Sequence, residues 1–181
     1  MIPPGYRLRP ARPDELDTLT AIERAAAVRF RDVGLEEVMA STVTPRAHLE
    51  AGLAAGRLIV AETATPSGSA VGFALSSVLD GDAHLEELDV LPEHGRRGLG
   101  RALVLGALAV GAREGRPRMT LSTLTLVPWN APFYERLGFV VLTSDEVGPE
   151  LRAACIADRE RGLPDDGRVL MGRALPRSVR R

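Results

Sequence analysis

The sequence predicts an α/β fold of the α+β type, in which one domain holds a mixed, mostly antiparallel sheet of about seven strands with helices on both faces. The chain has 181 residues, of which 45% are apolar, and this length and composition are typical of a single globular domain. Segments with strand periodicity alternate with segments of helical periodicity. Short turns join some strands and helices join others, which favours a mixed sheet.

The first half of the chain is expected to hold four strands and two helices. Residues 6–12, "YRLRPAR", alternate apolar and polar side chains as a strand does. Residues 13–30 have apolar positions at helical spacing, with Asp14 as the expected N-cap. A short helix over residues 45–56 ends at a glycine. Three strands are expected after it, over residues 57–64, 70–79 and 83–92.

The second half begins with a long apolar helix over residues 98–114, which Gly115 ends. The segments after it, in the order strand, helix, strand, helix and strand, are 118–127, 130–138, 139–143, 148–164 and 167–175. We therefore expect one domain over residues 1–181. Its parts are a core of about 6–142 with the last strand 168–175, a helical insert 144–167 and a basic tail 176–181.

Composition excludes several classes of protein. The net charge of −1 favours neither a nucleic acid nor a membrane as partner. No apolar run approaches the roughly 20 residues that span a bilayer, and the N-terminus lacks an apolar signal core. The single cysteine, Cys155, permits no internal disulfide and favours the cytoplasm. No cluster has the spacing of metal ligands, so we expect no metal.

The stretch "EHGRRGLGRAL", residues 93–103, combines glycines and arginines at the start of a helix. A helix N-terminus offers N–H groups and partial positive charge, and glycine lets an anion approach the backbone. The stretch predicts a phosphate-binding loop; a strand-to-helix turn with solvated arginines is the alternative. It is not a Walker P-loop, because the chain contains no lysine. The residues concerned are Gly95, Gly98, Gly100, Arg96, Arg97 and Arg101.

Two stretches together resemble the GNAT superfamily of N-acetyltransferases. "LDVLPEHGRRGLGRALV" is similar to the family's acyl-CoA signature, although Gly95 replaces its usual Gln or Arg. "PWNAPFYERLGF", residues 128–139, matches the family's second motif at Asn130, Phe133, Tyr134, Gly138 and Phe139, with one residue fewer after the asparagine. The resemblance covers about residues 6–142 and the last strand.

The resemblance implies that acetyl-CoA is the co-substrate and that the sheet is splayed where it binds. The pantetheine arm would pair with the backbone of residues 88–90, and the Val90 N–H would stabilise the oxyanion. Asn130, the only asparagine in the chain, would hydrogen-bond the pantetheine or cap the helix that follows. The residues expected to contact the cofactor are Leu88, Asp89, Val90, Arg96, Arg97, Gly98, Leu99, Gly100, Arg101 and Asn130.

Acetyl transfer also needs a base and an acid. His84 and Glu86 lie two residues apart on one strand and therefore share a face. The resemblance implies that the base comes from this strand, so Glu86 is the favoured base and His84 the second candidate. Both could instead be surface residues of a half-exposed strand. The resemblance implies that Tyr134 protonates the leaving thiolate; a core aromatic is the alternative.

The expected reaction transfers the acetyl group to a primary amine of a small molecule or peptide, by direct attack in a ternary complex. Acids on the first helices, which could attract a cationic amine, are Glu23, Asp32, Glu36 and Glu37. Each could equally be an ordinary surface residue. A non-catalytic acyl-CoA-binding or sensing module on the same fold is the alternative function, and both a monomer and a homodimer remain open.

Overall fold

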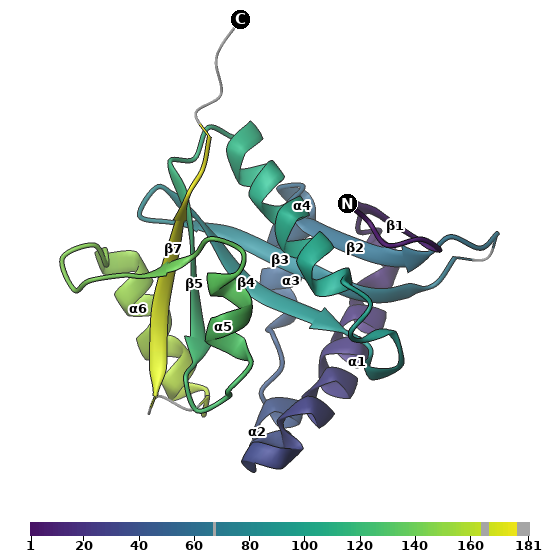
Figure 1. Cartoon of the computed structure of the whole chain (residues 1–181), viewed down its shortest axis with the longest axis horizontal. Coiled ribbons are helices and arrows are strands. Elements are labelled where there is room, and N and C mark those ends of the chain that lie inside the picture. Colours follow the sequence, from purple (N-terminus) through teal and green to yellow (C-terminus); the bar gives the residue numbers. More distant parts are fainter. Residues whose placement is uncertain (67, 164–166, 177–181) are drawn as a thin grey trace, which may run out of the picture. The chain divides into compact units, whose positions relative to one another are not determined.

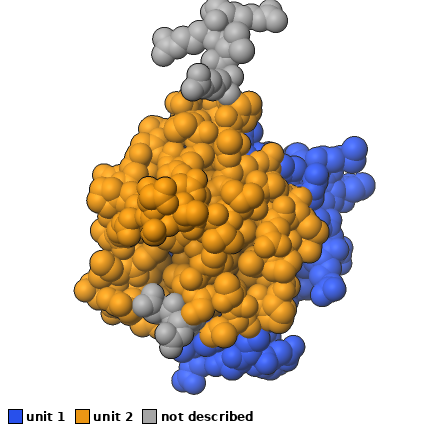
Figure 2. All heavy atoms as spheres, turned by 60° about the vertical axis from the view of Figure 1, so that its left-hand side comes forward, with its two compact units in different colours: residues 1–76, 86–109 blue, residues 77–85, 110–181 orange. Residues whose placement is uncertain are grey.

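The computed structural model describes residues 1–66, 68–163 and 167–176, and its elements are labelled in Figure 1. The basic tail predicted over 176–181 lies outside the described residues except for Pro176. The chain divides into two compact units (Figure 2). Unit 1 contains residues 1–76 and 86–109, and unit 2 contains residues 77–85 and 110–181. The expectation of one domain over the whole chain stays a prediction.

Seven strands form one sheet in the order β1-β2-β3-β4-β5-β7-β6. The β4–β5 pair is parallel, whereas β1–β2, β2–β3, β5–β7 and β6–β7 are antiparallel. The predicted mixed, mostly antiparallel sheet is therefore confirmed. The strands are β1 (Tyr6–Pro10), β2 (Leu58–Thr63), β3 (Ala70–Leu79), β4 (Asp82–Val90), β5 (Arg118–Leu124), β6 (Val140–Val141) and β7 (Arg168–Ala174).

The α-helices are α1 (Leu16–Ala26), α2 (Glu36–Ser41), α3 (Arg46–Ala54), α4 (Leu99–Arg113), α5 (Asn130–Glu135) and α6 (Pro149–Glu160). The short α2 was not predicted. Asp14 was wrongly predicted as an N-cap, because a 3-10 turn over Pro13–Glu15 precedes α1 and Arg12 is its cap. Within the described part of the chain, no helix has the length and apolar character needed to cross a membrane.

In unit 1, helices cover both faces of the sheet. Leu19 of α1 and Leu49 of α3 share a buried core with Val60 and Phe73 from β2 and β3. On the other face, α4 approaches the sheet at Gly106, where a Cβ atom would lie 2.6 Å from Ile59 Cδ1. Successive side chains of a strand point to opposite faces, so β2 contributes to both layers.

A buried carboxylate joins β1 to β2. Glu62 is 1% exposed and forms ion pairs with Arg7 and with Arg9, whose Nε lies 2.6 Å from Glu62 Oε2. Burial alone would raise the pKa of Glu62, but hydrogen bonds from the two arginines hold it below its usual range. Arg9 also donates to Glu15, at 2.5 and 2.8 Å, so one guanidinium links β1, β2 and the turn before α1.

In unit 2, the turn between β3 and β4 also caps α6. Asp80 and Gly81 have φ values of 52° and 82°, as a two-residue type I′ hairpin requires. The backbone N–H groups of Glu150 and Leu151 donate to Asp80 Oδ1 and Oδ2 at 3.0 and 2.9 Å. The Glu150 carboxylate accepts the N–H of Asp80 in return. This reciprocal pair attaches the predicted insert to the hairpin.

Replacing Asp80 by glycine tests this cap. Glycine adopts the positive φ without strain, so Asp80→Gly removes only the carboxylate. We expect the free energy of unfolding to fall by about 1–2 kcal/mol, the usual cost of a lost N-cap. Urea denaturation measures it, with Asp80→Asn, which keeps one oxygen acceptor, as the intermediate case. Equal stability of Asp80→Gly and the wild type would contradict the capping role.

Candidate active site

The C-terminal end of β4 lies tightly against β3. The Leu91 N–H donates to the Val71 carbonyl oxygen at 2.8 Å. A Cβ atom on Gly72 would lie 2.6 Å from the Asp89 carbonyl oxygen, so this approach requires glycine. Backbone groups of successive strand residues point to opposite sides, and the Val90 N–H therefore points away from β3.

The parallel register between β4 and β5 joins Ala83, His84 and Leu85 to Met119, Thr120 and Leu121. His84 lies inside this paired segment, is 7% exposed, and its Nδ1 lies 2.9 Å from Thr120 Oγ1. The alternative that His84 is a surface residue is therefore wrong. The role of His84 as a base stays a prediction, and it would require a buried imidazole to act.

Beyond this paired segment, β4 continues to Val90. The Leu88 N–H donates to Glu87 Oε1 at 3.0 Å, so a side chain of the same strand already occupies this donor. The Val90 N–H also points away from β3, and unlike the Leu88 N–H it does not donate to the Glu87 carboxylate. This agrees with the oxyanion role predicted for Val90, which remains a prediction.

The predicted phosphate loop connects β4 to α4 through a 3-10 turn over Pro92–His94. Two of its residues have left-handed backbone conformations, Arg96 with φ 56° and Gly98 with φ 86°. The Gly98 carbonyl oxygen accepts the Ala102 N–H at 3.0 Å, which opens α4 directly after the glycine. Leu99 is 1% exposed and anchors the start of the helix. The arginines predicted to bind phosphate are all exposed, namely Arg96, Arg97 and Arg101.

A hydrogen-bonded chain beside this loop was not predicted. Arg97 Nη1 lies 3.2 Å from the Tyr6 hydroxyl, and that hydroxyl lies 2.8 Å from His94 Nδ1. Because a guanidinium only donates, the Tyr6 oxygen accepts from Arg97, and the same hydroxyl shares a hydrogen bond with His94 Nδ1. Arg97 Nη2 also donates to the Glu93 carbonyl oxygen at 3.2 Å. These contacts hold the Arg97 charge beside the loop.

Glu86 contacts a residue that sequence reasoning missed. His48 Nδ1, on α3, lies 3.0 Å from Glu86 Oε2, and the two side chains are 53% and 22% exposed. His48 is one of three histidines in the chain, and this scarcity was the only signal in the sequence. The structure thus makes Glu86 half of a carboxylate–imidazole pair.

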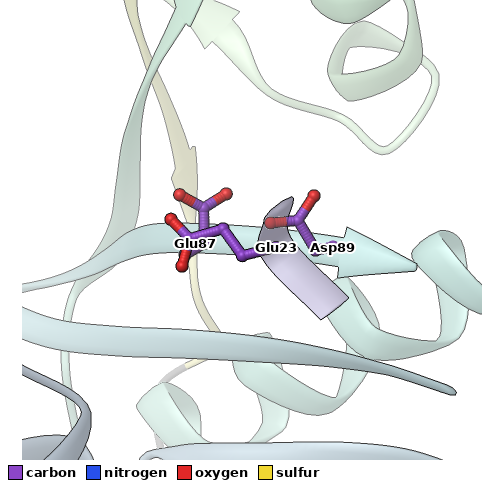
Figure 3. A group of neighbouring side chains, drawn as sticks. All are labelled: Glu23, Glu87 and Asp89. Atoms are coloured by element: carbon purple, nitrogen blue, oxygen red, sulfur yellow. The ribbon is translucent and has the colours of Figure 1, made fainter. Parts of the chain in front are cut away.

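The next residue, Glu87, lies with carboxylates of α1 and β4. One ligand oxygen each from Glu23, Glu87 and Asp89 lies within 4.8 Å of the others (Figure 3). Both α1 and α3 pack on the same sheet face, so Glu86 and Glu87 point to one face although they are consecutive. Side-chain alternation is therefore broken here, as at a β-bulge.

The three carboxylates influence one another. Burial is the main cause that raises the pKa of Asp89 well above its usual range, followed by the charges of Glu87 and Glu23, while Arg29 acts in the opposite direction. Glu23 also accepts hydrogen bonds from the Thr44 N–H and hydroxyl at 2.7 and 3.0 Å. Of the four acids predicted on the first helices, Glu23 is the buried one; Asp32, Glu36 and Glu37 are not buried.

In unit 2, Asn130 and Tyr134 lie on α5. Trp129 occupies the N-cap position without a side-chain cap bond, and Asn130 is the first helical residue, so the capping alternative for Asn130 is wrong. The Tyr134 ring makes edge contacts with Phe133 and Phe139, at centroid distances of 5.0 and 5.8 Å. Tyr134 is half-buried, and its role as an acid stays a prediction.

Replacing Asp89 by asparagine tests the electrostatics of this cluster. An unfolded aspartate titrates near about 3.9, and from there up to the raised folded pKa the folded state holds more protons. The wild type therefore loses stability as the pH rises through this window. We expect the melting temperature of Asp89→Asn, relative to wild type, to increase as the pH rises above about 4.

Asp82→Asn is the matched control, because Asp82 is also buried but is paired with Arg118. That substitution breaks an ion pair and should lower the melting temperature. Thermal melts of both variants across pH provide the measurement. A relative melting temperature of Asp89→Asn that falls with rising pH would refute the assignment.

Comparison with known proteins agrees with the fold. Residues 54–141 match the model of the acetyltransferase (GNAT) domain. The chain is similar to the PaiA N-acetyltransferase of Thermoplasma acidophilum, solved with coenzyme A, with 17% identity, TM-score 0.68 and coverage of 93% of this chain and 98% of that one. The chain is also similar to the ribosomal-protein-S18-alanine N-acetyltransferase of Escherichia coli, with 19% identity, TM-score 0.59 and coverage of 96% of each chain.

N-acetylglutamate synthase of Neisseria gonorrhoeae, solved with coenzyme A and N-acetyl-glutamate, is 21% identical with a TM-score of 0.69, over 95% of this chain and 35% of that one. At such identities these structures establish the fold, and the domain match over 54–141 adds the family. Residues 54–141 therefore belong to a GNAT acetyltransferase domain, and the chain has the fold of these acetyltransferases.

Proposed function

We propose that this chain transfers the acetyl group of acetyl-CoA to a primary amine of a small molecule or peptide, by direct attack in a ternary complex. The observation that carries the proposal is the left-handed loop at Arg96 and Gly98, which leads from the end of β4 directly into the N-terminus of α4. A helix of fifteen residues offers partial positive charge and N–H groups at that end.

The residues present fit the pyrophosphate of coenzyme A. The space beside Gly98 is open, since an added Cβ would meet only Pro3 Cγ, at 3.6 Å. Because glycine has no side chain to fill this space, an anion can reach the backbone N–H groups of the loop. Gly100 and the exposed guanidinium groups of Arg96, Arg97 and Arg101 complete the proposed binding set. Coenzyme A carries several phosphate charges, and these cations would stabilise it.

The segment 88–90 would hold the acyl end of the cofactor. The amides of the pantetheine arm can pair with strand backbone, so the Leu88 carbonyl oxygen and the Val90 N–H serve as partners. The same Val90 N–H would stabilise the oxyanion formed at the thioester carbonyl. Asn130 is proposed as a further hydrogen-bonding partner of the pantetheine.

The chemistry requires two proton transfers. An alkyl ammonium has a pKa of about 10.4, so a base is needed to free the attacking lone pair near neutral pH. Glu86, directly or through a group that it pairs with, is proposed to supply that base, and His84 is the second candidate. Tyr134 would donate to the departing sulfur; a phenol is a weaker acid than a thiol by about 1.5 pKa units, so it would act mainly as a hydrogen-bond donor.

The acceptor is proposed only as a class. The names of two similar structures indicate acetylation of amino groups, of glutamate in one and of a protein alanine in the other. A primary amine is the chemistry these have in common. A panel of amines, incubated with acetyl-CoA and assayed for free thiol, tests this class. Binding of acetyl-CoA without thiol release by any amine would support the sensing module instead.

Substitution of Gly98 tests the cofactor loop. Gly98→Ala and Gly115→Ala each place a methyl group at a positive φ, 86° and 73°, at opposite ends of α4. Both should cost about 1 kcal/mol of backbone strain. We expect coenzyme A affinity by calorimetry to fall at least about tenfold in Gly98→Ala alone. Equal affinities for the two variants would remove the loop from the site.

Removal of one hydroxyl tests the proposed acid. Tyr134→Phe should lower kcat by about 10²-fold with coenzyme A affinity unchanged, which is within the usual effect of one acid–base group. Tyr6→Phe is the matched deletion, since it breaks the contacts to Arg97 and His94 and should affect the KM for acetyl-CoA rather than kcat. Undiminished kcat in Tyr134→Phe would contradict the acid role.

A further inference from the structure

We propose that His48 is the general base for the acceptor amine and that Glu86 acts through it as a positioning residue. This inference rests on the proposed acetyl transfer and names the group that takes the proton. It is carried by the pairing of His48 Nδ1 with Glu86 Oε2 at 3.0 Å, across α3 and β4 of unit 1.

The hydrogen bond determines which ring nitrogen can act. A carboxylate only accepts, so Nδ1 of His48 carries the hydrogen and Nε2 presents a lone pair. The carboxylate also stabilises the imidazolium that forms when Nε2 takes a proton. The imidazole is 53% exposed and Glu86 is 22% exposed, so the ring is the more accessible of the two groups to an incoming amine.

The position on β4 suits this role. Glu86 precedes Leu88 by two residues, at most about 6.6 Å along the strand, and the proposed thioester site begins at Leu88. An imidazole held on the outer side of Glu86 extends the reach of the carboxylate by the length of one ring. His84 has a different environment, because it is buried and bonded to Thr120.

The protons and electrons balance as follows. Nε2 of His48 takes one proton from the ammonium and releases it to solvent. The freed lone pair forms the C–N bond at the thioester carbon, and the carbonyl electrons move to the oxygen. When they return, the C–S bond breaks with its electron pair on sulfur, which receives the second proton lost by nitrogen. The products are an amide, the coenzyme A thiol and one proton.

Chemical rescue tests the proposal with an amine that the wild type accepts. We expect His48→Ala to lower kcat by about 10²-fold, leaving coenzyme A affinity unchanged, and added imidazole to restore at least about tenfold. Glu86→Gln should lower kcat by about tenfold. The double variant should be no slower than His48→Ala, because the two residues act as a unit. Glu50→Gln, on the same helix and exposed, should match the wild type.

Each failure has its own signature. A wild type that releases no thiol with any amine overturns the acetyl transfer itself. A wild type that turns over, with His48→Ala equally fast, overturns the role of His48 alone. A larger loss in Glu86→Gln than in His48→Ala, without rescue by imidazole, would identify the carboxylate as the base.

Discussion

The break in side-chain alternation at Glu86 and Glu87 is the constraint on which the candidate site depends. A regular strand would direct one of these carboxylates toward α4. The bulge instead directs both toward the face covered by α1 and α3, where Glu86 meets His48 and Glu87 meets Glu23. Glu87 also accepts the N–H of its neighbour Leu88.

Buried carboxylates have two different environments in this chain. Glu62 and Asp82 are each paired with arginine, and their charges stabilise the strands they join. Asp89 lies instead with two other carboxylates, and burial raises its pKa. Such a concentration of like charge costs stability, and groups of this kind cluster at functional sites more than elsewhere. The cluster lies beside the segment that would hold the thioester.

Much of the fold followed from local patterns. β3 runs over Ala70–Leu79, as its sequence predicted, because an apolar run between turn residues leaves little ambiguity. The six-residue α2 was missed, since so short a helix depends on packing more than on periodicity. Asn130 was expected either to bind the pantetheine or to cap the following helix, but α5 begins at Asn130 itself and Trp129 occupies the N-cap position.

The candidate site was predictable only where its residues are close in sequence. The loop after β4 could be found, because glycines and arginines stand together. The His48–Glu86 pair and the association of Glu23 with Asp89 join separate elements, and only the tertiary structure brings them together. The burial of His84 was likewise not predictable, because it results from the pairing of β4 with β5, which places Thr120 beside the ring.

The attachment of α6 to the hairpin at Asp80 has a consequence for local unfolding. Of the twelve residues of α6, Leu151 alone is buried, so apolar packing contributes little to holding this helix. Its N-terminus is held by hydrogen bonds to one carboxylate. A segment held in this way can open as a unit while the sheet remains folded. Amide hydrogens of α6 should therefore exchange with solvent together and well before those of β5 and β7, whose register is continuous over seven residue pairs.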